Sequence, residues 1–141
     1  MKKIFISSDH AGFNLKEFIK KYLKKNKIKF NDLGPDTDAK VDYPDFAHKV
    51  AKKVAISNKH VGILVCGSGM GMNITANRHK NIRAAQCFNL KSTKLSRLHN
   101  DANIITLGSR LLSRKIALNC VSTFLTTKFE GGRHARRIKK I

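Results

Sequence analysis

The sequence predicts an α/β fold built around a parallel sheet, and three observations support this prediction. Strand-like and helix-like patterns alternate from one end of the chain to the other. Residues 61–67, VGILVCG, are apolar without alternation, as expected of a central strand covered on both faces. The chain has 141 residues, 41% of them hydrophobic, which is enough for a buried core. We therefore expect one domain over residues 1–141, with no internal linker.

The first two elements are a strand and a helix. Residues 2–7, KKIFIS, form a short run rich in β-branched and aromatic side chains, which favours a strand. Residues 14–26 follow, with apolar side chains at the spacing of one helical face. The side chains on that face are Leu15, Phe18, Ile19, Tyr22 and Leu23.

The second strand and helix are marked by turn residues. Residues 27–34 form an extended run that is closed by Gly34 and Pro35. After a turn-rich stretch, residues 44–57 have a helical pattern in which Pro44 stands near the first turn, where proline is tolerated. The central strand at 61–67 comes next.

The same alternation continues to the end of the chain. We expect helices at 72–79, 90–100 and 113–129, strands at 81–88 and 103–109, and one last short helix in the basic tail at 131–141. Repeated strand–helix units of this length predict a parallel sheet with helices on both faces.

The net charge of +20 raises the possibility of a nucleic-acid partner, because a basic surface attracts phosphate polyanions. However, the excess consists mostly of lysines spread along the chain, and aromatic side chains that stack on bases are not interleaved with them. Lysine, asparagine and isoleucine are all abundant and all have A/T-rich codons, so a compositional bias explains the charge more simply. We therefore expect no nucleic-acid partner.

Cysteine usage and hydropathy indicate a cytoplasmic protein. Cys66, Cys87 and Cys120 are odd in number, far apart and without a C-x-x-C pair, which favours neither a disulfide framework nor a zinc ribbon. No segment approaches the ~20 apolar residues of a membrane span, and the N-terminal apolar run is short. We expect free thiols in a reducing compartment and no membrane partner.

Polar and titratable residues follow the predicted strands. Ligands of parallel α/β sheets bind outside the carboxyl ends of the strands, so these positions are candidates for a site. We expect them to converge on one edge of the sheet. They are Ser8, Asp9, His10, Cys66, Gly67, Ser68, Gly69, Gly71, His99, Asn100, Gly108, Ser109 and Arg110.

The segment 64–73, LVCGSGMGMN, places a cysteine before a glycine-rich loop. The glycine spacing differs from that of a dinucleotide fingerprint, the loop follows the third strand instead of the first, and no phosphate-binding G-x-x-x-x-G-K-[ST] motif occurs. Such a loop supplies backbone N–H groups to an anion, although it could also be a tight turn without a ligand. The neighbouring Cys66 and Ser68 favour a functional site.

Five motifs in register resemble those of type B ribose-5-phosphate isomerases, whose family also contains the galactose-6-phosphate isomerase subunits. They are SDHAGFNLK, DYPDFA, GILVCGSGMGMNITANR, LSRLHNDANIITLGSR and FEGGRHARR. The resemblance implies a three-layer, Rossmann-like α/β/α sandwich with a five-stranded parallel sheet of order 2-1-3-5-4. It also implies a homodimer whose active sites are completed by the partner subunit, and it leaves open whether dimers assemble further into a tetramer. No metal or organic cofactor is implied.

The resemblance implies roles for the cysteine and its loop in aldose–ketose isomerisation of a sugar phosphate. Cys66 corresponds to the base that moves a proton between neighbouring carbons, and a helix N-terminus with its amides favours the thiolate. The N–H groups from Gly67 to Gly71 would hold the enediolate oxygen, and the Ser68 hydroxyl would assist proton movement. One branch of the family uses a glutamate just past the loop, where this chain has Met72, so Cys66 is the expected base.

The remaining site residues are assigned through the same resemblance. His99 corresponds to the acid that opens the sugar ring, and Tyr43 would support His99. The substrate-binding set implied by the resemblance comprises Asp9, His10, Tyr43, Gly67, Ser68, Gly69, Met70, Gly71, Asn100, Arg110, Arg133 and Arg137. The arginines of the tail suit a terminal phosphate, so we expect residues 131–141 to contribute to the dimer and to the phosphate site.

Other titratable residues are expected to be structural. We assign His48, His60 and His79 to the solvated surface, and Cys87 and Cys120 to the core. Two other functions remain open at this point. An isomerase of a six-carbon sugar phosphate, such as galactose 6-phosphate or allose 6-phosphate, would need a longer pocket. A non-catalytic protein that binds phosphosugars or nucleic acid would keep the anion sites without needing the thiol.

Overall fold

The computed structural model describes residues 2–141 and contains a five-stranded parallel sheet of order β2-β1-β3-β5-β4. The central strand is β3, and every residue from Val61 to Cys66 in it is buried. The strands are β1 (Lys3–Ser8), β2 (Asn31–Asp32), β3 (His60–Cys66), β4 (Ala84–Gln86) and β5 (Ile104–Gly108). The predicted strand order is confirmed.

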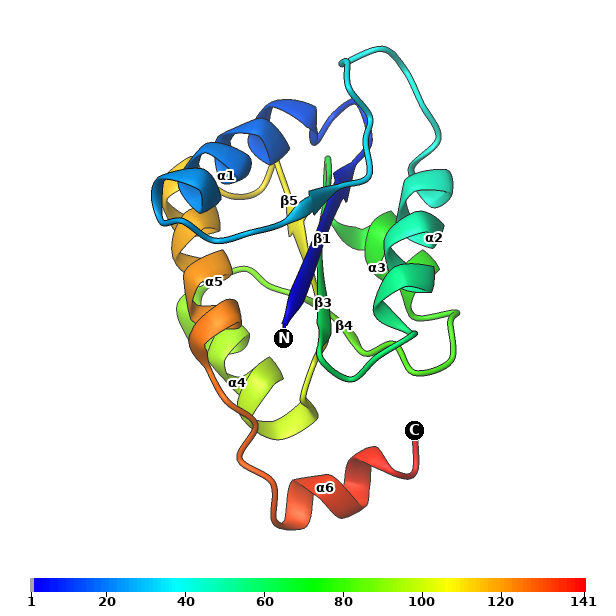
Figure 1. Ribbon diagram of the computed structural model, residues 1–141, viewed down its shortest axis with the longest axis vertical. Coiled ribbons are helices and arrows are strands. Elements are labelled where there is room, and N and C mark those ends of the chain that lie inside the picture. Colours follow the sequence, from blue (N-terminus) through cyan, green and yellow to red (C-terminus); the bar gives the residue numbers. More distant parts are fainter. Residues whose placement is uncertain (1) are drawn as a thin grey trace.

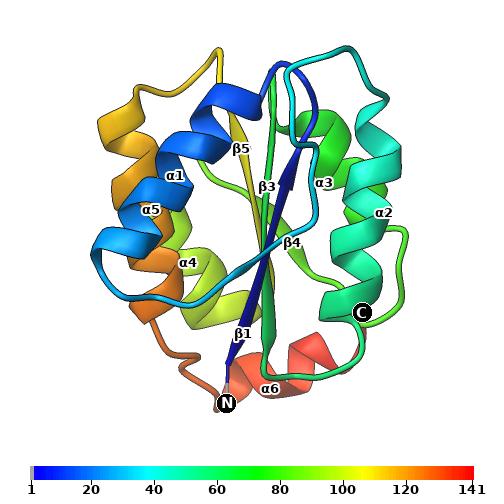
Figure 2. The ribbon, with the colours of Figure 1, turned by 45° about the horizontal axis from the view of Figure 1, so that its top comes forward.

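Helices cover both faces of the sheet. They are α1 (Phe13–Lys25), α2 (Tyr43–Val54), α3 (Met70–Ala76), α4 (Leu90–Asn100), α5 (Arg114–Thr126) and α6 (Arg133–Ile138). Figure 1 and Figure 2 show α1, α4 and α5 on one face and α2 and α3 on the other. The predicted three-layer α/β/α arrangement is therefore confirmed.

Each face of the sheet has its own apolar core, and β3 contributes to both because successive strand residues point to opposite faces. Ile63 and Val65 pack with residues of α1 and α5, including the fully buried Phe124. Leu64 and Cys66 belong to the second core, beneath α2 and α3. The side chain of Cys66 is thus directed to the α2–α3 face, at the carboxyl end of the sheet.

The edge strands are shorter than the sequence predicts. Strand β2 has only two residues, Asn31 and Asp32, where a strand was expected over residues 27–34, and β4 has three where one was expected over 81–88. Each of these strands pairs with the sheet on one side only, so fewer ladder hydrogen bonds define its length. Helix α3 begins at Met70, two residues before the predicted start.

Helix α6 lies at the end of the molecule beyond the amino ends of the strands. Figure 1 and Figure 2 both place it opposite the loops that follow β1 and β3. The tail reaches this end because α5 runs back along the sheet before the chain enters α6. Within residues 2–141, no helix is long and apolar enough to cross a membrane.

Candidate active site

A cavity of about 340 Å³ lies where the loops that follow β1, β3 and β5 meet. Its wall includes most of the polar residues expected at the carboxyl edge of the sheet. The lining residues are Asp9, His10, Ala11, Tyr43, Cys66, Gly67, Ser68, Gly71, Arg110 and Leu111. Ala11 and Leu111 are the two lining residues that were not predicted from the sequence, because they are apolar and carry no chemical signature.

The Cys66 sulfur accepts a hydrogen bond from the backbone N–H of Gly69 at 3.1 Å. The loop turns back on the thiol because Gly69 has a φ of +79°, a conformation that side chains disfavour. A Cβ at Gly69 would also lie 2.9 Å from the carbonyl carbon of Leu107. Glycine is therefore required at this position, and it places a donor on the sulfur, where a hydrogen bond stabilises negative charge.

Two amides of the glycine loop are occupied by groups of the chain itself. Gly69 donates to Cys66 Sγ, and Met70 donates to the Ser68 hydroxyl at 3.2 Å. Neither Gly69 nor Met70 lines the cavity. These two amides therefore bond within the loop itself, and their predicted contact with an anion stays a prediction. Gly67, Ser68 and Gly71 do line the cavity.

Asp9 and His10 leave β1 together and are held by the backbone. The buried Asp9 carboxylate accepts a hydrogen bond from the Gly12 amide at 2.9 Å. Nδ1 of His10 lies 3.2 Å from the carbonyl oxygen of Val41 and 3.3 Å from the Val41 amide nitrogen. These contacts fix both side chains at the cavity wall and connect the loop after β1 to the segment that precedes α2.

Tyr43 and Arg110 close the cavity from two sides. Tyr43 is the first residue of α2, and its ring packs so tightly on Gly71 that a Cβ there would lie 2.5 Å from Cε2. Arg110 donates its backbone N–H to the Gly67 carbonyl at 2.9 Å, and its guanidinium lies against the same glycine. The cavity thus combines a thiol, a carboxylate, an imidazole and a guanidinium.

Comparison with known proteins decides the family. The family model described as Ribose/Galactose Isomerase matches residues 4–141. The chain belongs to this family. It is 40% identical over 141 residues to ribose-5-phosphate isomerase B of Escherichia coli, covering 100% of this chain and 95% of the relative.

Solved structures of isomerases of this family share the fold. Ribose 5-phosphate isomerase B of Thermotoga maritima has a TM-score of 0.95 and 48% identity, with 99% of this chain and 96% of that chain covered. The Mycoplasma genitalium enzyme with bound ribulose-5-phosphate has a TM-score of 0.94 and 46% identity, with 98% and 92% covered.

Besides Gly69 and Met70, four residues that the family resemblance assigns to the site do not line the Cys66 cavity. They are His99, Asn100, Arg133 and Arg137. The expectation that His99 and Asn100 lie at the same edge of the sheet as Cys66 of the same chain is therefore wrong. A helix that links two parallel strands runs back to the start of the next strand, so the carboxyl end of α4 lies at the amino edge of the sheet. The arginines lie on α6, at the same end of the molecule.

His99 lies in a cluster with Glu130 and His134. The two imidazoles stack with centroids 4.3 Å apart and planes inclined by 13°, and Nε2 of each lies 3.8 Å from Oε2 of Glu130. Burial, together with the charge of Arg133, lowers the pKa of His134. The sequence analysis did not select Glu130 and His134, although their i, i+4 spacing in the FEGGRHARR motif is a signal that could have found them. Tyr43 lines the cavity that contains Cys66 and not the His99 cluster, so its predicted support of His99 stays a prediction.

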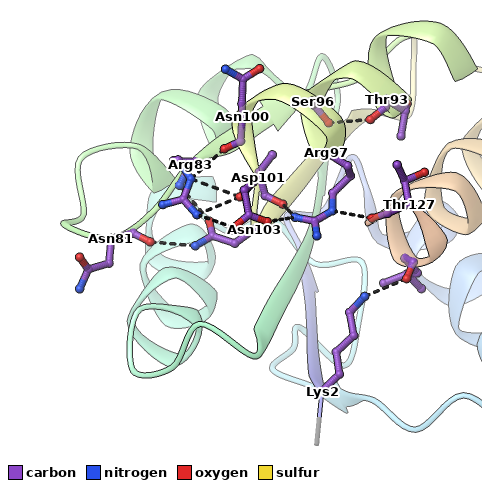
Figure 3. A network of polar contacts seen from close by, with 12 residues as sticks. Lys2, Asn81, Arg83, Thr93, Ser96, Arg97, Asn100, Asp101, Asn103 and Thr127 are labelled. Atoms are coloured by element: carbon purple, nitrogen blue, oxygen red, sulfur yellow. Dashed lines mark hydrogen bonds and ion pairs between the residues drawn. The ribbon is translucent and has the colours of Figure 1, made fainter. Parts of the chain in front are cut away.

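The segment that carries His99 is held by two arginines (Figure 3). Arg97 donates to Asp101 Oδ1 at 2.8 Å and to the Thr127 carbonyl at 3.2 Å, while Arg83 Nη2 donates to the Asp101 carbonyl at 2.9 Å. Asp101 has a φ of +43° and ends helix α4. Asn100 contributes its carbonyl oxygen, which accepts from Arg83 Nε at 2.9 Å. This network gives the end of α4 a defined geometry.

The other cysteines and histidines have structural positions. Cys87 and Cys120 are buried in the core, as predicted, and burial raises the pKa of both thiols. The three histidines assigned to the solvated surface, His48, His60 and His79, are partly exposed, and each also has a hydrogen-bond partner. His48 Nδ1 lies 2.6 Å from His79 Nε2, and His60 Nδ1 lies 2.8 Å from the Lys53 carbonyl oxygen.

Proposed function

We propose that this isomerase interconverts D-ribose 5-phosphate and D-ribulose 5-phosphate through an enediolate. One observation carries the proposal: Cys66 lines a cavity that also holds a carboxylate, an imidazole and a guanidinium, and its sulfur accepts a hydrogen bond from Gly69. Relatives support the substrate, since the Escherichia coli protein is named ribose-5-phosphate isomerase B and the Mycoplasma genitalium structure holds ribulose-5-phosphate.

Cys66 acts as the base in this mechanism. Its thiolate removes the proton from C2 of the open-chain aldose, which leaves an enediolate, and the resulting thiol returns the proton to C1 to form the ketose. The Ser68 hydroxyl accepts from the Met70 amide at 3.2 Å, so its own proton is available for donation to O1, and the same hydroxyl oxygen takes up the proton that O2 loses when the ketose forms. The amides of Ser68 and Gly71 are the proposed donors to the enediolate oxygen.

The other cavity residues bind the substrate. The Asp9 carboxylate accepts hydrogen bonds from sugar hydroxyls, and His10 and Tyr43 border the chain of carbon atoms. Arg110 supplies positive charge beside the glycine loop. No metal or organic cofactor is required by this mechanism, because the thiol and the amides supply the base and the stabilising donors.

A second copy of the chain completes the site. His99 opens the sugar ring, Asn100 binds a hydroxyl, and Arg133 and Arg137 bind the phosphate from the partner's tail, residues 131–141. Two features support a homodimer: α6 lies at the opposite end of the molecule from the cavity, and large apolar side chains are exposed on α3 and on the segments that follow β4 and β5. These exposed side chains are Met70, Ile74, Phe88, Leu90 and Leu111. Pairs of dimers could assemble further into a tetramer.

We place the enzyme in the cytoplasm, in the pentose phosphate pathway, with a small sugar phosphate as its ligand. The absence of a membrane-spanning helix within residues 2–141 supports this placement, as do the free thiols of Cys66, Cys87 and Cys120. Neither a membrane nor a nucleic acid is a proposed partner.

The test is ketose formation by the purified protein in the presence of EDTA. Ribose 5-phosphate should be converted with a higher kcat/KM than galactose 6-phosphate or allose 6-phosphate. A preference for a six-carbon substrate would instead support the alternative isomerase activity. Binding of ribose 5-phosphate without turnover would identify a non-catalytic phosphosugar-binding protein and overturn the proposal.

A further inference from the structure

Three metal-ligating groups meet where α4 ends and the tail begins. His99 is in the last turn of α4, Glu130 precedes α6, and His134 lies within α6. One donor atom from each residue lies within 4.8 Å of the donor atoms of the other two. Nε2 of both imidazoles is 3.8 Å from Glu130 Oε2.

The ring nitrogen Nε2 of His134 lies in this cluster and has no hydrogen-bond partner. The His134 side chain is only 7% exposed, and this nitrogen is itself buried. A buried polar nitrogen without a partner costs free energy, so such an atom indicates a missing ligand, a water molecule or an ion. The nearest charged oxygen belongs to Glu130, and His99 stacks on the ring.

The backbone holds the three groups in place before any ligand binds. The Glu130 amide donates to the Leu98 carbonyl at 3.1 Å, which ties the loop to α4. Gly131 and Gly132 have φ values of +75° and +56°, and this sharp turn brings His134 back over Glu130. The Arg83 and Arg97 contacts to Asp101 fix the end of α4 next to His99 (Figure 3).

Two imidazoles and one carboxylate are a donor set that zinc prefers, whereas calcium and magnesium prefer oxygen ligands. Tetrahedral zinc with bonds of about 2.0–2.2 Å needs donor atoms roughly 3.4 Å apart, so the 3.8 Å separations must contract only slightly. His99 is 38% exposed and Glu130 is 47% exposed, which allows the His99 ring to turn out of its stack. Because both side chains are exposed, a water molecule can reach the fourth coordination position of a tetrahedral zinc ion.

We propose that His99, Glu130 and His134 form a binding site for a zinc ion, which inhibits the enzyme by removing His99 from the substrate. The metal acts here as a reversible inhibitor and not as a cofactor. The binding site stands on its own geometry. The inhibitory half of the proposal rests on the proposed function, in which His99 opens the sugar ring.

Arg133 and Arg137 lie close enough to act electrostatically on His134. Their charge opposes a cation, and the Glu130 carboxylate compensates for only part of it. We therefore expect weaker binding than at structural zinc sites, and competition from inorganic phosphate, which the same arginines attract.

Metal binding is tested on the full chain after treatment with EDTA and removal of the chelator. Titration with Zn²⁺ followed by calorimetry should give one ion per chain, and Co²⁺ should produce the visible absorption of a tetrahedral site. Glu130→Gln and His134→Gln should each weaken binding at least about tenfold. Glu130 is half exposed, so its variant keeps the test valid even if His134→Gln folds poorly.

Matched control variants distinguish this site from other side chains of the protein that could bind zinc. His48→Gln and His79→Gln alter the other histidine pair, whose nitrogens lie 2.6 Å apart, and should leave zinc affinity unchanged. Cys66→Ser should also leave it unchanged. The proposal is overturned if no zinc binds, or if binding is lost in these controls and kept in Glu130→Gln.

Activity provides the second readout. Zn²⁺ should inhibit conversion of ribose 5-phosphate, EDTA should restore it, and Glu130→Gln should require at least about tenfold more zinc for half inhibition. If one zinc binds through Glu130 while turnover continues unchanged, inhibition through His99 is refuted. If the protein has no isomerase activity at all, the proposed function fails and the calorimetric result still decides the zinc site.

Discussion

Gly69 donates its backbone N–H to the sulfur of Cys66 at 3.1 Å. This contact distinguishes Cys66 from the other two cysteines, which are buried in the core on the opposite face of the sheet. Cys66 thus lines the cavity and has a backbone N–H donor directed at its sulfur.

Cys66→Ser should reduce kcat about 10²- to 10⁴-fold, the range for loss of a positioned general base, while KM stays close to the native value. The hydroxyl occupies almost the same space as the thiol but is a far weaker base, and the substrate contacts remain. Steady-state kinetics of the purified variant, with circular dichroism to verify folding, measure the effect.

Cys87→Ser and Cys120→Ser are the controls for this variant. Both should retain most of the wild-type kcat, because these thiols pack in the core and do not touch the cavity. Iodoacetamide should label Cys66 first, and substrate should protect it. A folded Cys66→Ser protein with more than a few per cent of wild-type turnover would place the base elsewhere.

Gly71→Ala should impair catalysis without destabilising the fold. The new Cβ would lie 2.5 Å from Tyr43 Cε2, so the ring must move from the cavity wall, and kcat/KM should fall about 10- to 100-fold. Alanine favours the α3 helix over glycine by up to about 1 kcal/mol, so the free energy of unfolding should stay equal or rise. Urea unfolding and steady-state kinetics separate the two effects.

A double-mutant cycle tests whether Tyr43 mediates this effect. Gly71→Ala in a Tyr43→Ala background should cause little further loss, because the clashing ring has been removed. An equal loss of kcat/KM in both backgrounds would mean that Gly71 is needed for a reason other than the Tyr43 contact.

Asp32→Asn should lower stability most at neutral pH. Asp32 accepts from the fully buried Lys16 at 3.0 Å, from Lys20 at 2.5 Å and from the Gly34 amide at 2.9 Å. Partial burial raises the pKa of Asp32, but these bonds outweigh it and hold the pKa below its usual 3.8. The carboxylate therefore stabilises the fold above that pH, and the stabilisation is lost as the pH falls through the folded-state pKa.

Removing the charge leaves Lys16 buried without its anion, which should cost about 3 kcal/mol at pH 7. Urea unfolding at pH 7 and pH 3 should show the difference between variant and wild type shrinking in acid. Asp38→Asn, at an exposed carboxylate, should change little at either pH. A difference of the same size at pH 3 would refute the assigned role of the charge.

The basic surface should bind duplex DNA only weakly. Six lysines border an open groove at the β1–β2 edge and could contact phosphates; they are Lys2, Lys3, Lys20, Lys24, Lys29 and Lys53. Binding through phosphates alone should fade steeply between about 50 and 200 mM salt. Fluorescence anisotropy with two unrelated duplexes measures this, and submicromolar, sequence-selective binding at physiological salt would contradict it.

The sequence predicts the sheet because each strand–helix unit leaves a local pattern, clearest in the buried residues of β3. The lengths of β2 and β4 could not be predicted, since pairing on one side only gives a weak local signal. Similarly, no pattern indicates that the Gly69 amide bonds to the Cys66 sulfur, because this depends on the close approach of Gly69 to Leu107 and Gly108.

The larger error concerns His99. Its position next to a strand suggested the carboxyl edge of the sheet, but it stands before β5 and not after it, and the returning helix α4 carries it to the amino edge. Only three-dimensional topology shows that His99 meets Glu130 and His134 there.

The separation of Cys66 from His99 within one chain has a genetic consequence. If every site takes Cys66 from one subunit and His99 from its partner, a mixed dimer of a Cys66→Ser chain and a His99→Asn chain contains one doubly defective site and one intact site. Two inactive alleles expressed together would then complement each other, with random mixing restoring about a quarter of wild-type activity. Either allele alone would restore none.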